Sequence, residues 1–480
     1  MKKPRFGSSM AAIALVLSGC GGGGSVVGGG TAVTPTPTPT PTGNTCSLVD
    51  RQNWAFGQMN EWYLFPETLP TSLNPAPFAT VNAYIDALTA TARGQGRDRF
   101  FTYVTSIAQE NAFFASGSSA GFGFRISTDA TARRAFIMEA FEGTTALAAG
   151  IDRGDEILAI GETTTTLRTV TDIIAAEGTA GVTAAFGPTT VGVTRTLQVS
   201  GTAGTRTVTI AKTDYALTPI SARYGNQIIT EGALRVGYLN LRTFISTADP
   251  ALRSAFEQFR AQGITNFIID FRYNGGGLVS TAELMGDLLG GNRTTSDVYS
   301  LTAFRASKSS QNSTRRFAPG AQSVSPVKVA FIGTGATASA SELVINSFIP
   351  YLGTNMALIG TNTFGKPVGQ IALDRSQCDD RLRVVAFSTR NSANSDNYFT
   401  GLASTVPVTC RATDDFTRPL GNAQESSTRA ALDFLQGRSC TAIAASGQVS
   451  QAARSTAPLQ LEMLTPMAPS PAQREVPGTF

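Results

Sequence analysis

The stretch NFIIDFRYNGGG, residues 266–277, decides the fold that this sequence predicts. Its first six residues make an almost unbroken apolar run, typical of a strand buried on both faces of a parallel sheet. Three more buried strands are expected at 233–241, 327–333 and 356–361, and helical patterns separate them. Because crossover helices join parallel strands, the sequence predicts an α/β core with a mostly parallel sheet. We expect the remaining strands, such as 382–388, to pair at an edge of this sheet.

The 480 residues divide into several parts, because composition and hydrophobic period change along the chain. The final segment is rich in Ala, Ser, Pro and Gln and lacks apolar periodicity, so we expect it to be disordered. The expected parts are a signal peptide at 1–20, a Gly/Thr-Pro linker at 21–45, a small helical region at 46–114, a β-rich domain at 115–216, the α/β core at 217–440 and a disordered tail at 441–480.

The chain contains no histidine, which excludes Ser-His-Asp and Cys-His catalysis and any zinc site with histidine ligands. An enzyme built from this chain must therefore move protons with Lys, Asp, Glu, Tyr or Cys. Lysine is rare as well, so few lysines are available for catalysis. The net charge of +4 is small for this length and does not favour nucleic-acid binding.

The N-terminus is typical of an exported protein. A positive start precedes an apolar run at 10–17 that is far too short to span a bilayer. The sequence LSGC at 17–20 resembles the lipobox of bacterial lipoproteins, which implies that Cys20 becomes the acylated first residue. Gly21 follows where Asp would be the usual inner-membrane retention signal, so we expect an outer-membrane anchor facing the periplasm. An ordinary secretory signal with a chance cysteine is the alternative.

Four cysteines remain after Cys20, and an even number in an oxidising compartment indicates two disulfides. Three pairings are open. We favour Cys378 with Cys410 and Cys46 with Cys440, because the second bond would tie the ends of the folded part together. Free buried thiols are the alternative.

Two segments resemble known functional motifs but lack residues that those motifs need. GTNTFGKP at 360–367 is one residue away from a phosphate-binding loop, but Pro367 lacks both the hydroxyl and the N–H that such a loop needs. GSSAG at 117–121 fits a nucleophile elbow, but that motif needs a histidine partner. We therefore expect neither a nucleotide site nor a nucleophile at these positions.

The β-rich domain resembles a PDZ domain through two stretches at a suitable separation. They are GFGF at 121–124 and ALAAGIDRGDEILAI at 146–160. In a PDZ domain, backbone N–H groups of the first stretch hold the C-terminal carboxylate of a peptide, which adds a strand to the sheet. The resemblance therefore implies a substrate-binding loop made of Gly121, Phe122, Gly123 and Phe124.

Three motifs of the core, in this order, resemble those of the carboxyl-terminal processing proteases, also called tail-specific proteases. They are RYNGGG at 272–277, TASASE at 337–342 and TFGKPVGQ at 363–370. The resemblance covers about 46–440 and includes the order of helical region, PDZ-like domain and α/β core. It implies a serine protease that needs no metal or organic cofactor.

The family's functional residues transfer to matching positions of this sequence. The resemblance implies that Ser339 is the nucleophile, that Lys366 is the general base, and that Gln370 helps to place the lysine. An oxyanion hole would be built from the backbone N–H groups of Ala340, Gly276 and Gly277. This sequence departs from the family at Pro367, where glycine is usual, and its longer spacing from Ser339 to Lys366 leaves Ser341 as a rival nucleophile.

Physical chemistry sets a condition on the Ser/Lys pair. Lysine acts as a base near neutral pH only if its pKa falls from ~10.4 to about 7–8, which corresponds to ~4 kcal/mol. Burial supplies that much when no carboxylate lies close, so Glu342 must point away from the amine. Ser339 is expected at a helix N-terminus, whose N–H groups suit a developing oxyanion.

We therefore expect a lipid-anchored serine endopeptidase of the bacterial cell envelope. Its PDZ-like domain would capture the C-termini of extended or unfolded proteins and feed them to the Ser339/Lys366 dyad. One alternative is a non-catalytic PDZ-based peptide-binding lipoprotein, and another is a Ser/Lys amidase that acts on cell-wall peptides. The sequence leaves open whether the chain forms a homodimer.

Overall fold

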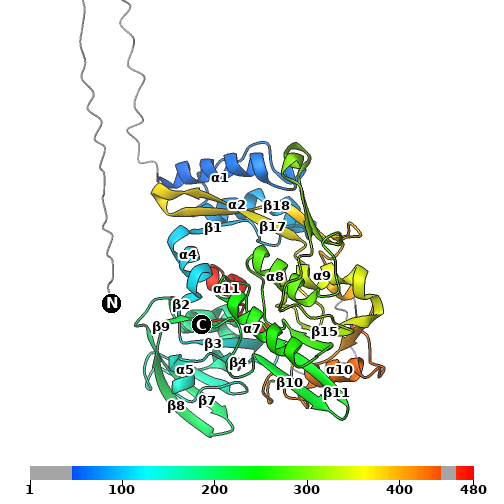
Figure 1. Cartoon of the computed structure of the whole chain (residues 1–480). Helices are drawn as coiled ribbons and strands as arrows, with labels where there is room; N and C mark the ends of the chain where they lie inside the picture. Colours follow the sequence, from blue (N-terminus) through cyan, green and yellow to red (C-terminus); the bar gives the residue numbers. More distant parts are fainter. Residues whose placement is uncertain (1–45, 445–460) are drawn as a thin grey trace, which may run out of the picture. The chain divides into compact units, whose positions relative to one another are not determined.

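The computed structural model describes residues 46–444 and 461–480 (Figure 1). The predicted signal peptide at 1–20 with Cys20, the linker at 21–45 and residues 445–460 of the tail lie outside the described residues. Every helix in the described ranges is too short or too polar to cross a membrane.

The core sheet of the α/β part has six strands. Its N-terminal hairpin is antiparallel, and every other neighbouring pair is parallel, so the predicted mostly parallel sheet is confirmed. The strands, in order across the sheet, are β10 (Asn226–Glu231), β11 (Leu234–Asn240), β12 (Asn266–Asp270), β15 (Lys328–Gly333), β16 (Met356–Gly360) and β19 (Thr409–Arg411).

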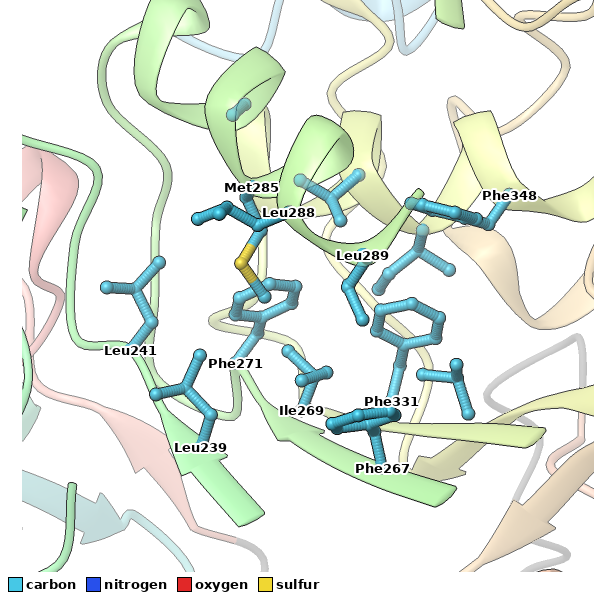
Figure 2. Close-up of a cluster of buried hydrophobic side chains, with 14 of the residues drawn as sticks. Leu239, Leu241, Phe267, Ile269, Phe271, Met285, Leu288, Leu289, Phe331 and Phe348 are labelled. Carbon is cyan, nitrogen blue, oxygen red and sulfur yellow. The ribbon is translucent and has the colours of Figure 1, made fainter. Parts of the chain in front are cut away.

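Alternate residues of these strands face two different apolar layers. Phe267 and Ile269 of β12 pack with α7 (Ala248–Ala261), α8 (Val279–Leu289) and α9 (Ala340–Leu352), as Figure 2 shows for part of this layer. Ile268 faces the opposite layer with α10 (Ser426–Leu435). Burial on both faces explains why the strand carries an unbroken apolar run rather than an alternating one.

The β-rich domain forms a seven-stranded sheet around a separate apolar cluster. Helix α6 (Val170–Ala185) covers it with Ile173 and Val182. Its strands are β20 (Glu462–Met463), β3 (Phe124–Asp129), β4 (Arg134–Ala140), β5 (Glu156–Gly161), β6 (Arg168–Thr169), β7 (Thr194–Gly201) and β8 (Gly204–Ala211). The segment GSSAG belongs to strand β2 (Ser118–Gly121), which pairs with β9 (Thr213–Ala216), so it does not form the strand-to-helix turn of a nucleophile elbow.

The N-terminal region is helical in large part, with α1 (Leu48–Trp62), α2 (Val81–Leu88), α3 (Ala90–Gly94) and α4 (Ile107–Ser116). It also contains strand β1 (Tyr103–Ser106), which pairs with β18 (Asp380–Arg390). The expected edge position of 382–388 on the parallel sheet is therefore wrong. Strand β18 lies in a second, five-stranded sheet with β1, β13 (Val298–Phe304), β14 (Ser313–Arg316) and β17 (Val368–Arg375).

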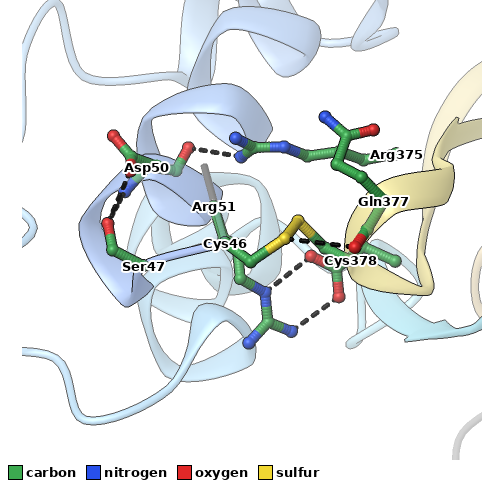
Figure 3. The surroundings of a disulfide bond; sticks show 8 residues. Cys46, Ser47, Asp50, Arg51, Arg375, Gln377 and Cys378 are labelled. Carbon is green, nitrogen blue, oxygen red and sulfur yellow. Dashed lines mark hydrogen bonds and ion pairs between the residues drawn. A yellow bond between two sulfur atoms is a disulfide. The ribbon is translucent and has the colours of Figure 1, made fainter. Parts of the chain in front are cut away.

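The favoured disulfide pairing is also wrong, because the structure joins Cys46 to Cys378 and Cys410 to Cys440. The turn after β17 lies beside the start of α1, where Arg51 donates two hydrogen bonds of 2.6 Å to Asp380 (Figure 3). This packing sets the Cα atoms of Cys46 and Cys378 5.5 Å apart. The sequence shows no sign of it, because the two segments are 332 residues apart.

The prediction of a disordered tail at 441–480 is wrong for residues 461–480. They contain strand β20 and helix α11 (Pro471–Glu475), and α11 lies beside α4 (Figure 1, red). Val476 and Phe480 are at most 5% exposed. The apolar residues of the tail enter clusters of other parts of the chain, so they need no periodicity of their own.

Candidate active site

Ser339 stands at the N-terminus of α9, directly after the turn that follows strand β15. Its φ of 56° is in the left-handed region, which a residue other than glycine adopts only at a cost. Two contacts of the preceding turn hold this shape. Thr337 Oγ1 donates to Phe271 O at 2.7 Å, and Ala338 N–H donates to Asn274 O at 3.1 Å. Ala340 is the first residue of the helix, so its N–H has no intrahelical acceptor.

The glycine turn at 275–277 lies against Ser339. A Cβ on Gly276 would stand 2.8 Å from the Ser339 Cβ, so only glycine fits there. The N–H of Gly276 donates to Asn274 Oδ1 at 2.9 Å, so one of the predicted oxyanion donors already has an acceptor in this structure. Buried Arg272, which forms ion pairs of 2.9 Å with Asp270 and Glu425, fixes the start of the turn.

Lys366 lies in the loop before β17, and its amine is half-buried. The Nζ atom donates to Gln370 Oε1 at 2.9 Å and stands 5.1 Å from the centre of the Phe101 ring. Burial lowers the pKa of Lys366 below its ordinary value, while the carboxylates of Glu475 and Asp98 act to raise it. The structure thus brings Lys366 and Gln370 together as predicted, but the described residues include no hydrogen bond from Lys366 Nζ to Ser339.

Glu342 connects the nucleophile and the lysine through the backbone, a role that the sequence did not predict. One oxygen of its fully buried carboxylate accepts from the N–H groups of Ser339 at 3.0 Å and Lys366 at 2.7 Å. The other accepts from Thr363 Oγ1 at 2.6 Å and Gly365 N–H at 2.7 Å. Burial raises the pKa of Glu342, and these hydrogen bonds oppose the rise.

Arg99, from the N-terminal region, also contacts the lysine loop. Its guanidinium donates to the carbonyl oxygens of Phe364 and Gly365 and lies 4.2 Å from the centre of the Phe364 ring. No sequence motif marks this residue, because its partners come from a distant part of the chain.

Ser341, the rival nucleophile, is fully buried. Its hydroxyl donates to Asn274 O at 3.0 Å. The geometry gives it a structural role in holding the glycine turn against α9.

The loop predicted to bind substrate has an occupant in this structure. The N–H groups of Phe122, Gly123 and Phe124 point to an oxygen of Phe480 at 3.0, 3.0 and 3.4 Å. A Cβ on Gly121 would stand 2.9 Å from the Phe480 carbonyl carbon, so the small residue permits this approach. No motif of the sequence marks Phe480 as part of the site.

Residues 235–405 match the sequence model of peptidase family S41. The chain is 27% identical over 251 residues to a carboxyl-terminal-processing protease of Picosynechococcus sp., covering 52% of this chain and 55% of that protein. The chain therefore contains a peptidase family S41 domain. A second relative is carboxyl-terminal-processing peptidase 3, chloroplastic, of Arabidopsis thaliana, 26% identical over 334 residues, with 69% of this chain and 60% of that protein covered. The chain thus spans little more than half the length of these curated relatives.

A crystal structure of an S41 protease from Bacteroides fragilis has the same fold. Its TM-score is 0.60 at 24% identity, over 80% of this chain and 97% of that chain. The family match contains Ser339, Glu342 and Lys366. It does not contain the loop at 121–124, Arg99 or the tail. The sequence predicted the loop, but the structure alone adds Arg99 and the tail to the site.

Proposed function

We propose that the chain is a serine endopeptidase in which Ser339 is the nucleophile, Lys366 the general base and Gln370 the residue that orients the lysine. One observation carries the proposal. A buried carboxylate, Glu342, ties the backbone of Ser339 to that of Lys366, while the side-chain amine of Lys366 hydrogen-bonds to the neutral amide of Gln370 beside the Phe101 ring. Burial and a neutral hydrogen-bond partner favour the uncharged form of a lysine, and the Glu342 contacts hold its backbone near a helix N-terminus.

The proposed reaction follows from these positions. The neutral Lys366 amine takes the hydroxyl proton of Ser339 as its oxygen bonds to the substrate carbonyl carbon. The negative charge that develops on the carbonyl oxygen is stabilised by the N–H of Ala340, with the N–H of Gly277 as the further donor that the family resemblance implies. The N–H of Gly276, which the resemblance also implies, would first have to leave Asn274 Oδ1. The lysine then gives the proton to the departing amine as the C–N bond breaks. Water cleaves the acyl-enzyme in the same way and releases the acid.

We further propose that the substrate is an extended or unfolded protein whose C-terminus enters the PDZ-like domain. The convergence of the Phe122, Gly123 and Phe124 N–H groups on one oxygen of Phe480 supports this, because such a cluster of donors suits a carboxylate.

Hydrolysis of casein by purified full-length variants tests the proposed activity. Ser339→Ala and Lys366→Ala should each lower the rate by at least about a thousandfold, as expected when one member of a catalytic unit is lost. Ser341→Ala is the control and should retain activity. If the wild type and both variants behave alike, the chain is a binding protein instead.

A substrate whose C-terminal carboxylate is amidated separates the protease from a Ser/Lys amidase. The amidase should cleave the amidated substrate as well as the substrate with a free carboxylate.

We also propose that Cys20 is acylated and anchors the chain in the cell envelope. Metabolic labelling with palmitate should mark the wild type and not the Cys20→Ala variant. Labelling of both would contradict the proposal.

A further inference from the structure

The chain's own residues 476–480 pair with strand β3 as an added strand. Phe480 N–H donates to Phe124 O at 3.0 Å, and Ile126 N–H donates to Gly478 O at 2.9 Å. Thr479 forms an antiparallel bridge with Arg125. This is the geometry by which an extended peptide adds to a sheet edge.

The rest of the same edge is covered by the same tail. Strand β20 pairs with Ser127 and Thr128, and Leu464 N–H donates to Ile126 O at 3.1 Å. An external peptide therefore cannot add a strand to β3 unless the tail leaves.

The side chain of Phe480 fills an aromatic pocket. It is 5% exposed, and its ring centre lies 5.1 Å from that of Phe186. Phe186 in turn contacts the rings of Phe122 and Phe124, and Val182 belongs to the same cluster. The pocket thus fits a large aromatic side chain directly beside the N–H donors that hold the Phe480 oxygen.

The segment before Phe480 crosses the active site. The carbonyl oxygen of Glu475 accepts from the N–H of Gly275, in the glycine turn, at 2.9 Å. A Cβ on Gly275 would stand 2.8 Å from Arg474 O, so the tail backbone packs directly on this turn. Glu475 and Lys366 line one cavity of about 1260 Å³.

Hydrogen bonds within the tail stabilise this path across the site. Ser470 and Gln473 form a capping box at the start of α11, and the Gln473 side-chain amide donates to Thr479 O at 2.8 Å. Val476 is fully buried with Phe113 and Phe141. The helix and the final strand therefore bind as one unit.

We propose that residues 471–480 are a built-in competitor of substrate, which occupies both the peptide groove and the cleft beside Lys366, and that the groove selects C-termini ending in a large aromatic residue. The predicted effect of the tail on hydrolysis rests on the proposed function, whereas the predicted binding of the tail in the groove does not. An incoming C-terminus must displace the tail, so its apparent affinity falls by the fraction of molecules in which the groove is free. Burial lowers the pKa of Lys366, and within the tail Glu475 acts to raise this pKa while Arg474 acts to lower it.

Binding is tested in full-length protein that carries Ser339→Ala, so that hydrolysis plays no part. The probe is fluorescein-labelled Val-Pro-Gly-Thr-Phe with a free carboxylate, followed by fluorescence anisotropy. Adding Phe480→Asp should tighten probe binding by about tenfold or more, because it weakens the internal competitor. Intact-mass measurement verifies that each purified chain ends at residue 480.

Three controls make the binding test specific. Val191→Asp introduces the same charge at an exposed apolar position of the same domain and should leave probe binding unchanged. The amidated probe, and a probe that ends in Ala, should each bind at least about tenfold more weakly than the free acid ending in Phe. Phe480→Ala is a milder variant, and thermal unfolding verifies that each variant is folded.

The outcome is decisive in either direction. Equal probe affinity with the intact and the altered tail, or equal affinity for the acid and the amide, overturns the inference. A parallel casein assay with Ser339 intact should show a faster rate for Phe480→Asp than for wild type. Tighter probe binding with no hydrolysis by any variant would leave the groove inference standing and remove the protease proposal. Hydrolysis that depends on Ser339 and Lys366, without any effect of the Phe480 variants, would support the protease proposal and overturn the groove inference.

Discussion

The carboxylate of Glu342 accepts a hydrogen bond of 2.7 Å from the backbone N–H of Lys366. The same oxygen accepts from Ser339, so one buried side chain sets the positions of two residues that are 27 apart in the sequence. It contacts the lysine backbone and not the side-chain amine. In the proposed mechanism Glu342 is therefore a positioning residue.

Glu342→Gln should lower both stability and activity. The amide keeps one oxygen but turns an NH₂ group toward two of the four donors, and each buried donor without an acceptor costs ~1–3 kcal/mol. We expect the free energy of unfolding in urea to fall by about 2–4 kcal/mol and kcat for casein to fall by at least about tenfold in the folded protein. Loss of stability with unchanged kcat would limit Glu342 to a structural role.

Gln370→Glu should move the pH dependence of hydrolysis to higher pH. A carboxylate 2.9 Å from Lys366 Nζ would favour the charged amine and raise its pKa by about 1–3 units. Because only the neutral amine accepts the serine proton, the rise of kcat/KM with pH should shift by the same amount. Gln370→Met, which adds no charge, should lower the rate without that shift. An unchanged profile in Gln370→Glu would show that Lys366 is not the titrating base.

Glu475→Gln should move the same profile to lower pH. Burial lowers the pKa of Lys366, Glu475 and Asp98 act to raise it, and Arg474 and Arg383 act to lower it. Removing the Glu475 charge therefore leaves the lysine with a lower pKa, and activity should rise at a more acidic pH than in wild type. Asp86→Asn is the control, because it removes a carboxylate that is not among these charged groups. A shift toward higher pH would contradict the proposed position of the tail.

Asp414 should contribute to loss of stability in acid. Burial alone would raise its pKa, but Arg153 and Arg272 outweigh this and hold the pKa at about 2, below the ordinary 3.8. A depressed carboxylate pKa gives stability that is present above the unfolded pKa and lost as pH falls through the folded one. The stability difference between wild type and Asp414→Asn should therefore shrink by about 2 kcal/mol between about pH 5 and pH 2. Urea unfolding at several pH values measures it, and a constant difference would contradict the shift.

The sequence was sufficient to predict the α/β core and the approximate positions of its strands. Burial on both faces of the sheet leaves long apolar runs that no other element explains. It was also sufficient to indicate the peptidase family S41 domain and to select the candidate residues Ser339, Lys366 and Gln370, since these lie in short motifs with fixed spacing. It failed for the disulfide pairs and for the strand β1, where contacts between distant segments override the local pattern.

What the sequence by itself determined is local: which segments are apolar enough to be buried, and which short motifs hold the candidate nucleophile, the candidate base and the candidate peptide-binding loop. Only the tertiary structure decided that Glu342 joins the two catalytic candidates, that Arg99 holds the lysine loop, and that residues 461–480 fold across the site. The physical reason is that those interactions are single hydrogen bonds and buried side chains between segments far apart in the chain. Neither kind of contact imposes a period or a composition on the residues that make it.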